Sequence, residues 1–237
     1  MSVWYCLPSA RADGGTIAAW RRAGYDVAVW RDIGAPEIDA DMIIRGTYPG
    51  YALATNHLIH DVLRADRYCD WVVAGGDDVM PDPDHDPNDI ASECTMHFGS
   101  TFGVMQPVGD SWGEDEPWAI RAYPKSRRRY IERICGSPWI GREFCERMYQ
   151  GRGPFWPEFY HQFVDEHMQA VCEKLGVLWQ RYDLTHYHAH ALRVHETPVP
   201  PWVTLTQGQD HWREAKAIFE RLQAGGFAEA HDLLEVK

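Results

Sequence analysis

The 237-residue sequence has few features of a membrane protein, a disulfide-rich protein or a polyanion-binding protein. Its apolar runs fall far short of the ~20 residues of a membrane-spanning helix, and its N-terminus has no charged segment followed by an apolar one, so we expect neither a membrane span nor a signal peptide. The six cysteines form no Cys-x-x-Cys pair, which favours reduced, buried thiols in a cytoplasmic protein. Acidic residues outnumber basic ones by 35 to 23, and the net charge of −12 opposes general attraction to nucleic acid or anionic membranes.

The chain has enough apolar residues for one large core, with 45% hydrophobic and 13% aromatic residues. Short apolar runs bounded by Gly, Pro or Asp are expected as strands at 3–7, 27–30, 42–44, 71–74, 101–106, 134–140 and 177–179. Helical spacing is expected at 17–23, 50–65, 89–98, 141–149 and 158–175, and again near the C-terminus at 212–222 and 228–234. This alternation predicts an α/β fold with a mostly parallel central sheet flanked by helices, followed by a Pro-rich linker and a short C-terminal helical appendage.

The segment from Trp71 to Pro83 organises the rest of the chain. Its unbroken apolar run predicts a strand that is buried on both faces, and the paired acids Asp77 and Asp78 follow where such strands present ligands. Two adjacent carboxylates repel each other unless a cation lies between them, and Mg²⁺ or Mn²⁺ carrying a substrate phosphate is the natural partner. The alternative is a solvated acidic turn.

The acidic residues of 82–93 have the spacing of a calcium-binding loop, but Pro87 occupies the position where that loop requires glycine. We therefore expect a solvated loop that caps the next helix through Asn88 or Asp89.

Three alternating histidines, His186, His188 and His190, would share one face of a strand and could bind Mn²⁺ or Zn²⁺. We expect one of them to join Asp78 on a metal, and a purely structural role is the alternative. Asp165 and Glu166 are expected in the middle of a helix, where they are either solvated or supply a general base.

A basic run at 121–133 is the local exception to the acidic composition. Its cations are interleaved with aromatic residues, a pattern that suits a phosphate-bearing ligand with rings that stack. A helix surface without any such role is the alternative. The candidate acceptor-binding residues are Arg127, Arg128, Arg129, Trp139 and Trp156.

Together these motifs resemble inverting glycosyltransferases of the GT-A fold, family 2-like, over roughly residues 3–195. The resemblance implies a metal-dependent enzyme with a nucleotide-sugar donor, for which a UDP-sugar is the best match. It assigns the donor ribose to Asp77, the metal to Asp78 with one of His186, His188 and His190, and the catalytic base to Asp165 or Glu166. The implied donor-binding residues are Pro8, Ser9, Arg11, Asp32, Arg45, Asn56, Gly76 and Asp77. We expect a domain at 1–196, with a nucleotide-sugar half at 1–100 and an acceptor half at 101–196, followed by the linker and helices at 197–237.

The segments 136–143, 163–166 and 175–181 also look like phage-encoded glycosyltransferases associated with hypermodified DNA. That likeness implies a hydroxymethylated pyrimidine of DNA as the acceptor and the host cytoplasm as the location. Two alternatives stay open: an acceptor in a cell-envelope glycan or lipid-linked sugar, and a non-catalytic nucleotide- or metal-binding module.

Overall fold

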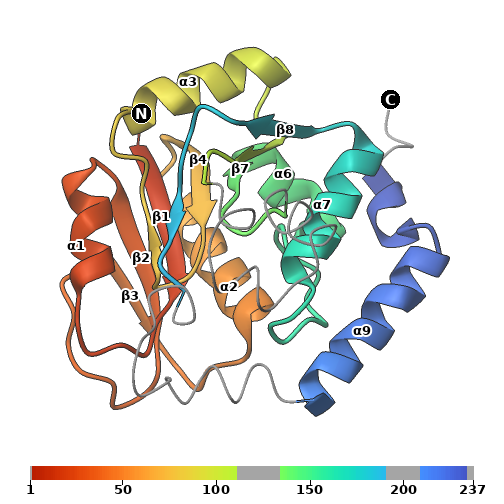
Figure 1. The fold of residues 1–237 in the computed structure, drawn as a ribbon, viewed down its shortest axis with the longest axis horizontal. Coiled ribbons are helices and arrows are strands. Elements are labelled where there is room, and N and C mark those ends of the chain that lie inside the picture. The colour runs from red at the N-terminus through yellow and green to blue at the C-terminus, as the bar shows by residue number, and fades with distance from the viewer. Residues whose placement is uncertain (1, 111–133, 191–208, 234–237) are drawn as a thin grey trace.

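The computed structural model describes residues 2–110, 134–190 and 209–233. Within these residues seven strands form one sheet in the order β3-β2-β1-β4-β7-β6-β8, and every pairing is parallel except the two made by β7 (Figure 1). The strands are β1 Ser2–Pro8, β2 Asp26–Arg31, β3 Met42–Arg45, β4 Cys69–Ala74, β6 Val104–Pro107, β7 Trp139–Gly141 and β8 Leu178–Arg181. The predicted α/β fold with a mostly parallel central sheet is confirmed.

Helices cover both faces of this sheet. One face packs against α1 (Gly15–Arg22) and α3 (Pro87–Phe98). The other packs against α2 (Tyr51–Ala65), α6 (Arg142–Arg147), the 3-10 helix η1 (Met148–Gly151) and α7 (Val164–Leu175). In β1, Tyr5 and Leu7 belong to the first core and Cys6 to the second, so burial of both faces accounts for the unbroken apolar runs.

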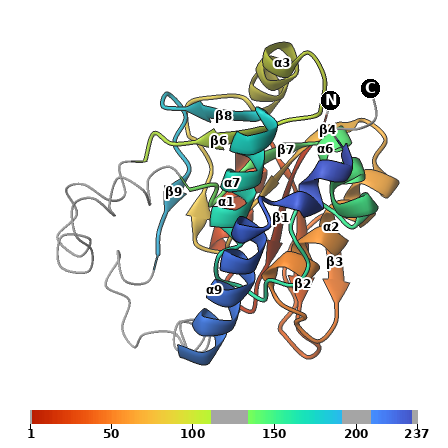
Figure 2. The same ribbon diagram turned by 90° about the vertical axis from the view of Figure 1, so that its right-hand side faces the viewer.

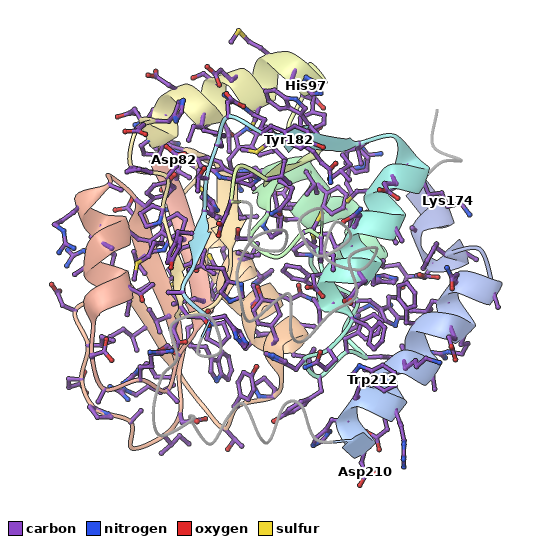
Figure 3. The ribbon with its side chains drawn as sticks, viewed as in Figure 1. Asp82, His97, Lys174, Tyr182, Asp210 and Trp212 are labelled. Atoms are coloured by element: carbon purple, nitrogen blue, oxygen red, sulfur yellow. The ribbon has the colours of Figure 1, made fainter. Side chains whose placement is uncertain are left out.

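The C-terminal helices pack on the outside of α7. Helix α9 (Gln209–Ala224), drawn in blue, begins beyond the N-terminal end of α7, and the 3-10 helix η2 (Ala228–Leu233) follows it (Figures 1 and 2). The Phe163 ring lies 5.4 Å from Phe219 and 5.7 Å from Trp212, which belongs to the first turns of α9 (Figure 3). His167 Nε2 lies 2.9 Å from Glu229 Oε1. These contacts tie the appendage to the helix that carries Asp165.

A small second sheet was not expected from the sequence. Strand β5 (Val79–Met80) pairs antiparallel with β9 (Tyr187–His188), with Val79 opposite His188. Figure 2 shows β9 on the side of the main sheet away from α2. This pairing connects the residues directly after Asp78 to the histidine-rich segment more than a hundred positions further along the chain.

Two local expectations are corrected. The helix expected at 158–175 begins only at Val164, because Phe163 adopts a left-handed backbone with φ of 65°. Asp165 and Glu166 therefore lie in its first turn rather than in its middle. The cap of α3 is Asp86, whose carboxylate accepts from the Asn88 N–H at 2.8 Å, with Pro87 at the first helical position.

The expectation that the cysteines are unpaired and buried agrees with the structure. All six cysteines are free and buried. Among the described residues, none of the helices combines the length and apolar character needed to cross a membrane.

Candidate active site

Asp77 joins two loops at the C-terminal edge of the sheet. Its carboxylate accepts from Ser9 Oγ at 2.8 Å and pairs with Arg11 Nε at 3.2 Å, and both partners lie in the loop after β1. Thr16 Oγ1, in the first turn of α1, donates to the Asp77 carbonyl at 2.7 Å. Burial raises the pKa of Asp77, while the bonds from Ser9 and Arg11 oppose that rise. The structure thus brings together Ser9, Arg11 and Asp77 from the predicted donor set.

The two glycines before the acids are required by close packing. Tyr5 Oη donates to the Gly76 carbonyl at 2.6 Å, and a Cβ on Gly75 would lie 2.4 Å from Tyr5 Oη. A Cβ on Gly76 would lie 2.7 Å from Asp78 Oδ1. Side chains at these positions would therefore displace Tyr5 or the second acid.

Asp78 is 7% exposed and faces two histidines. Its Oδ1 lies 3.2 Å from His188 Nε2, and the His188 and His190 ring centroids are 5.4 Å apart. Burial opposes ionisation of Asp78, but His188 and His190 together hold its pKa below the usual value. Burial, aided by His188, lowers the pKa of His190 to about 4, so this imidazole is neutral near pH 7.

His186 does not share this environment, which corrects its expected metal role. It is buried, with Nδ1 at 3.0 Å from Ser137 Oγ and Nε2 accepting from Trp139 Nε1 at 3.4 Å. Its ring packs edge-on against Trp20 at 5.1 Å. Because both ring nitrogens are engaged in the core, His188 and His190 are the histidines of this cluster that face Asp78.

Asp165 comes from α7, a different part of the fold from Asp77 and Asp78. In the first turn of a helix its carboxylate is stabilised by the helix dipole, and its Oδ1 accepts from the Glu166 N–H at 3.1 Å. The charges of Asp165 and Asp78 both act on the ring of His161, whose pKa burial nonetheless lowers. His161 thus marks a region that both acids border. Sequence analysis missed it because an isolated histidine before a helix carries no motif.

Two predicted contact residues are structural instead. Asn56 is 3% exposed; its Nδ2 donates to the Phe155 carbonyl at 2.8 Å and its Oδ1 accepts from the Phe155 N–H at 3.1 Å. Trp139 is fully buried in β7. Donor binding by Asn56 and acceptor binding by Trp139 are therefore corrected, because each side chain is enclosed by the protein.

The other predicted residues are distributed as follows. Asp32 is exposed just after β2 and accepts from the Tyr48 N–H at 3.0 Å, and Arg45 ends β3 and pairs with Glu37 at 2.7 Å. Pro8 ends β1, and Trp156 is partly buried beneath the Arg152 guanidinium at 5.2 Å. The basic residues Arg127, Arg128 and Arg129 lie outside the described residues.

No protein-family model matches this chain, and no curated protein does either. Among solved structures it is similar to A197 from STIV, with a TM-score of 0.48 and 14% identity over 79% of this chain and 85% of that one. It is also similar to the catalytic domain of Drosophila β1,4-galactosyltransferase 7 in complex with xylobiose (TM-score 0.48, 13% identity, 83% of this chain and 73% of that one). A third is glucosyl-3-phosphoglycerate synthase from Mycobacterium tuberculosis with Mn²⁺, UDP-glucose and glycerol 3-phosphate (TM-score 0.39, 14% identity, 76% and 69%).

Proposed function

We propose that this protein is a metal-dependent inverting glycosyltransferase that uses a nucleotide-sugar donor, most simply a UDP-sugar. The observation that carries the proposal is the buried Asp78 paired with His188 at 3.2 Å, next to Asp77 held by Ser9 and Arg11. Carboxylates at the carboxyl ends of parallel strands occupy the edge where open α/β sheets bind ligands.

The side chains around Asp78 suit a divalent metal. One buried carboxylate and the imidazoles of His188 and His190 offer the oxygen and nitrogen ligands that Mn²⁺ accepts. Among the described residues, no three acid, histidine or cysteine side chains already converge at metal-binding distances, so a third ligand would have to move toward Asp78 and His188 to complete the site. The bound cation, Mn²⁺ or Mg²⁺, would neutralise charge that develops on the departing diphosphate.

The donor nucleotide is assigned to the loops around Asp77. Ser9, Arg11 and Asp77 form one hydrogen-bonded group, which suits a ribose hydroxyl, and Asp32 stands at the end of the neighbouring strand β2. Arg45 and Pro8 border the same edge as further donor contacts.

Asp165 is the proposed general base. It would take the proton from an acceptor hydroxyl while that oxygen attacks the anomeric carbon, and the bonding pair of the broken bond would leave with the diphosphate. Attack from the opposite face inverts the configuration. Glu166 is its neighbour in the same helical turn, and adjacent helical side chains do not share a face, so only one of them can serve. Asp165 is favoured because its charge acts on Tyr51 and His161.

The acceptor we propose from the phage-like segments is a hydroxymethylated pyrimidine of DNA, which would place the enzyme in a host cytoplasm. The −12 charge favours the alternative, a cell-envelope glycan. Neutralising Arg127, Arg128 and Arg129 together should flatten the salt dependence of activity if the acceptor is DNA. An unchanged salt slope would favour the glycan.

The donor proposal is tested by thermal unfolding with a panel of nucleoside diphosphates, with Mn²⁺ and again with a chelator. A ligand at a hundred times its Kd adds about 2.7 kcal/mol of stability, so we expect a clear, metal-dependent rise in Tm with UDP. Asp78→Asn should lose this response, whereas the matched control Asp84→Asn, at an exposed acid, should keep it. No response to any nucleotide would refute the donor assignment and favour a binding module of another kind.

A further inference from the structure

His161 is fixed in place by the segment around it. The Tyr160 carbonyl accepts from the Tyr51 N–H at 2.6 Å, and a Cβ on Gly50 would lie 2.7 Å from that same carbonyl oxygen. This contact pins the segment before α7 to the first residue of α2. The His161 ring then lies edge-to-face on Tyr51, with centroids 6.2 Å apart and an interplanar angle of 89°. Its position is therefore set by backbone contacts rather than by a polar partner.

One nitrogen of this ring is unsatisfied. His161 Nδ1 is buried and has no hydrogen-bond partner among the residues that the structure describes. Buried polar atoms in proteins are almost always paired, so an unpaired one needs an explanation, and a ligand atom is one.

The surroundings of His161 show which ligand atom would suit it. Asp78 and Asp165 both act electrostatically on the ring, and burial nevertheless lowers its pKa. A neutral imidazole carries one N–H and one lone pair, which match a hydroxyl group better than a diphosphate. In an inverting displacement, the leaving diphosphate and the attacking hydroxyl lie on opposite faces of the anomeric carbon. With the diphosphate at Asp78 and the acceptor at Asp165, the transferred sugar lies between these two acids.

We propose that His161 Nδ1 hydrogen-bonds a hydroxyl of the sugar being transferred and so contributes to the choice of sugar. This proposal rests on the proposed function. It assigns His161 to the sugar itself, whereas the nucleotide and the metal belong to Asp77, Asp78 and the two histidines beside Asp78.

The test compares His161→Phe, which keeps the ring and removes its nitrogens, with His161→Asn, which restores a polar atom near the position of Nδ1. Calorimetric titration in Mn²⁺ measures the Kd of UDP and of UDP-glucose, UDP-galactose and UDP-N-acetylglucosamine for each protein. We expect His161→Phe to leave the Kd of UDP within about twofold and to weaken the best UDP-sugar by about tenfold, which is the size of one lost hydrogen bond. His161→Asn should recover part of that loss.

A donor series identifies the hydroxyl. For one deoxy analogue of the best UDP-sugar, the wild-type protein should show a Kd about tenfold higher than for the parent sugar. The His161→Phe variant should bind that analogue and the parent sugar equally well, because the hydrogen bond is already lost. Equal weakening of UDP and UDP-sugar in His161→Phe, or no weakening of either, would overturn the proposal while leaving the glycosyltransferase assignment intact. A wild type that binds no UDP would remove the proposed function and this inference with it. Should His161→Phe fail to fold, His161→Asn and His161→Gln measured against the deoxy series give the same decision.

Discussion

The two sides of the candidate site are built in different ways. On the donor side, Ser9, Arg11 and Asp77 follow adjacent parallel strands and are already hydrogen-bonded to one another. On the proposed acceptor side, His161 and Asp165 come from the loop before α7 and from α7 itself, and the charges of Asp165 and Asp78 both act on the His161 ring. The sheet topology thus explains the first side, whereas the second depends on contacts between segments distant in sequence.

The difference also appears in how polar atoms are satisfied. The Asp77 carboxylate has partners on both oxygens, whereas His161 Nδ1 has none. A side whose polar groups are already paired holds a ligand by exchanging some of those bonds. A side with an unpaired group gains a bond when a ligand arrives. The predictions below test this contrast, from the largest expected effect to the smallest.

Replacing Asp165 by Asn should have the largest effect, a loss of transfer activity on the order of a thousandfold, because the acceptor hydroxyl loses its base. UDP-sugar binding should remain close to wild type, since the donor groups are untouched. Initial rates and calorimetry measure the two quantities. Glu166→Gln is the matched control and should keep most of the activity. If Glu166→Gln instead loses more activity than Asp165→Asn, Glu166 is the base.

Asp82→Ala should lower the free energy of unfolding by about 2 kcal/mol at neutral pH. The Asp82 carboxylate is buried and accepts from the Thr185 N–H at 2.7 Å and from the His85 N–H at 3.0 Å, so it anchors the segment that leads to His188. Denaturant unfolding measures the change, and Asp84→Ala is the exposed control.

The same carboxylate gives a pH test. Burial raises the pKa of Asp82, but the hydrogen bonds from Thr185 and His85 outweigh burial and hold it below the usual value. A depressed folded-state pKa adds stability above the unfolded pKa of about 4, and that stability is lost as pH falls through the folded value. The difference between wild type and Asp82→Ala should therefore shrink below about pH 4. A difference that stays constant to pH 2 would mean that ionised Asp82 contributes nothing.

Asn56→Ala should cost about 2 kcal/mol of stability, because it leaves both the Phe155 N–H and the Phe155 carbonyl unpaired inside the protein. The Kd of UDP should change little. A large loss of UDP affinity at unchanged stability would restore the donor role that the structure argues against.

Arg11→Ala should have the smallest effect, a several-fold rise in the Kd of UDP with little change in stability. The Arg11–Asp77 pair is partly exposed, so its contribution to folding is small, while its cation lies close to the expected position of the donor. Arg22→Ala, at an exposed arginine of α1, is the control. Equal Kd values for all three proteins would remove Arg11 from the donor set.

The sequence predicts the seven strands of the main sheet, the burial of both faces of the strand before the paired acids, and the position of those acids, but not the β5–β9 pair. The apolar run that ends at Ala74 predicts a buried strand, because a strand buried on both faces must be apolar throughout. Asp77 and Asp78 follow such a strand, and parallel strands end at one edge, so their meeting with Ser9 and Arg11 follows from the pattern.

Only the tertiary structure decided which of the other polar residues face the site. The alternation of His186, His188 and His190 predicted a shared face, yet His186 turns into the aromatic core while the pairing of β9 with β5 places His188 at Asp78. Asn56 and Trp139 belong to the predicted donor and acceptor sets but are enclosed by packing, and His161 has no motif at all. The physical reason is that local spacing fixes the period of a strand or helix, whereas the burial of a given side chain depends on what distant segments lay against it.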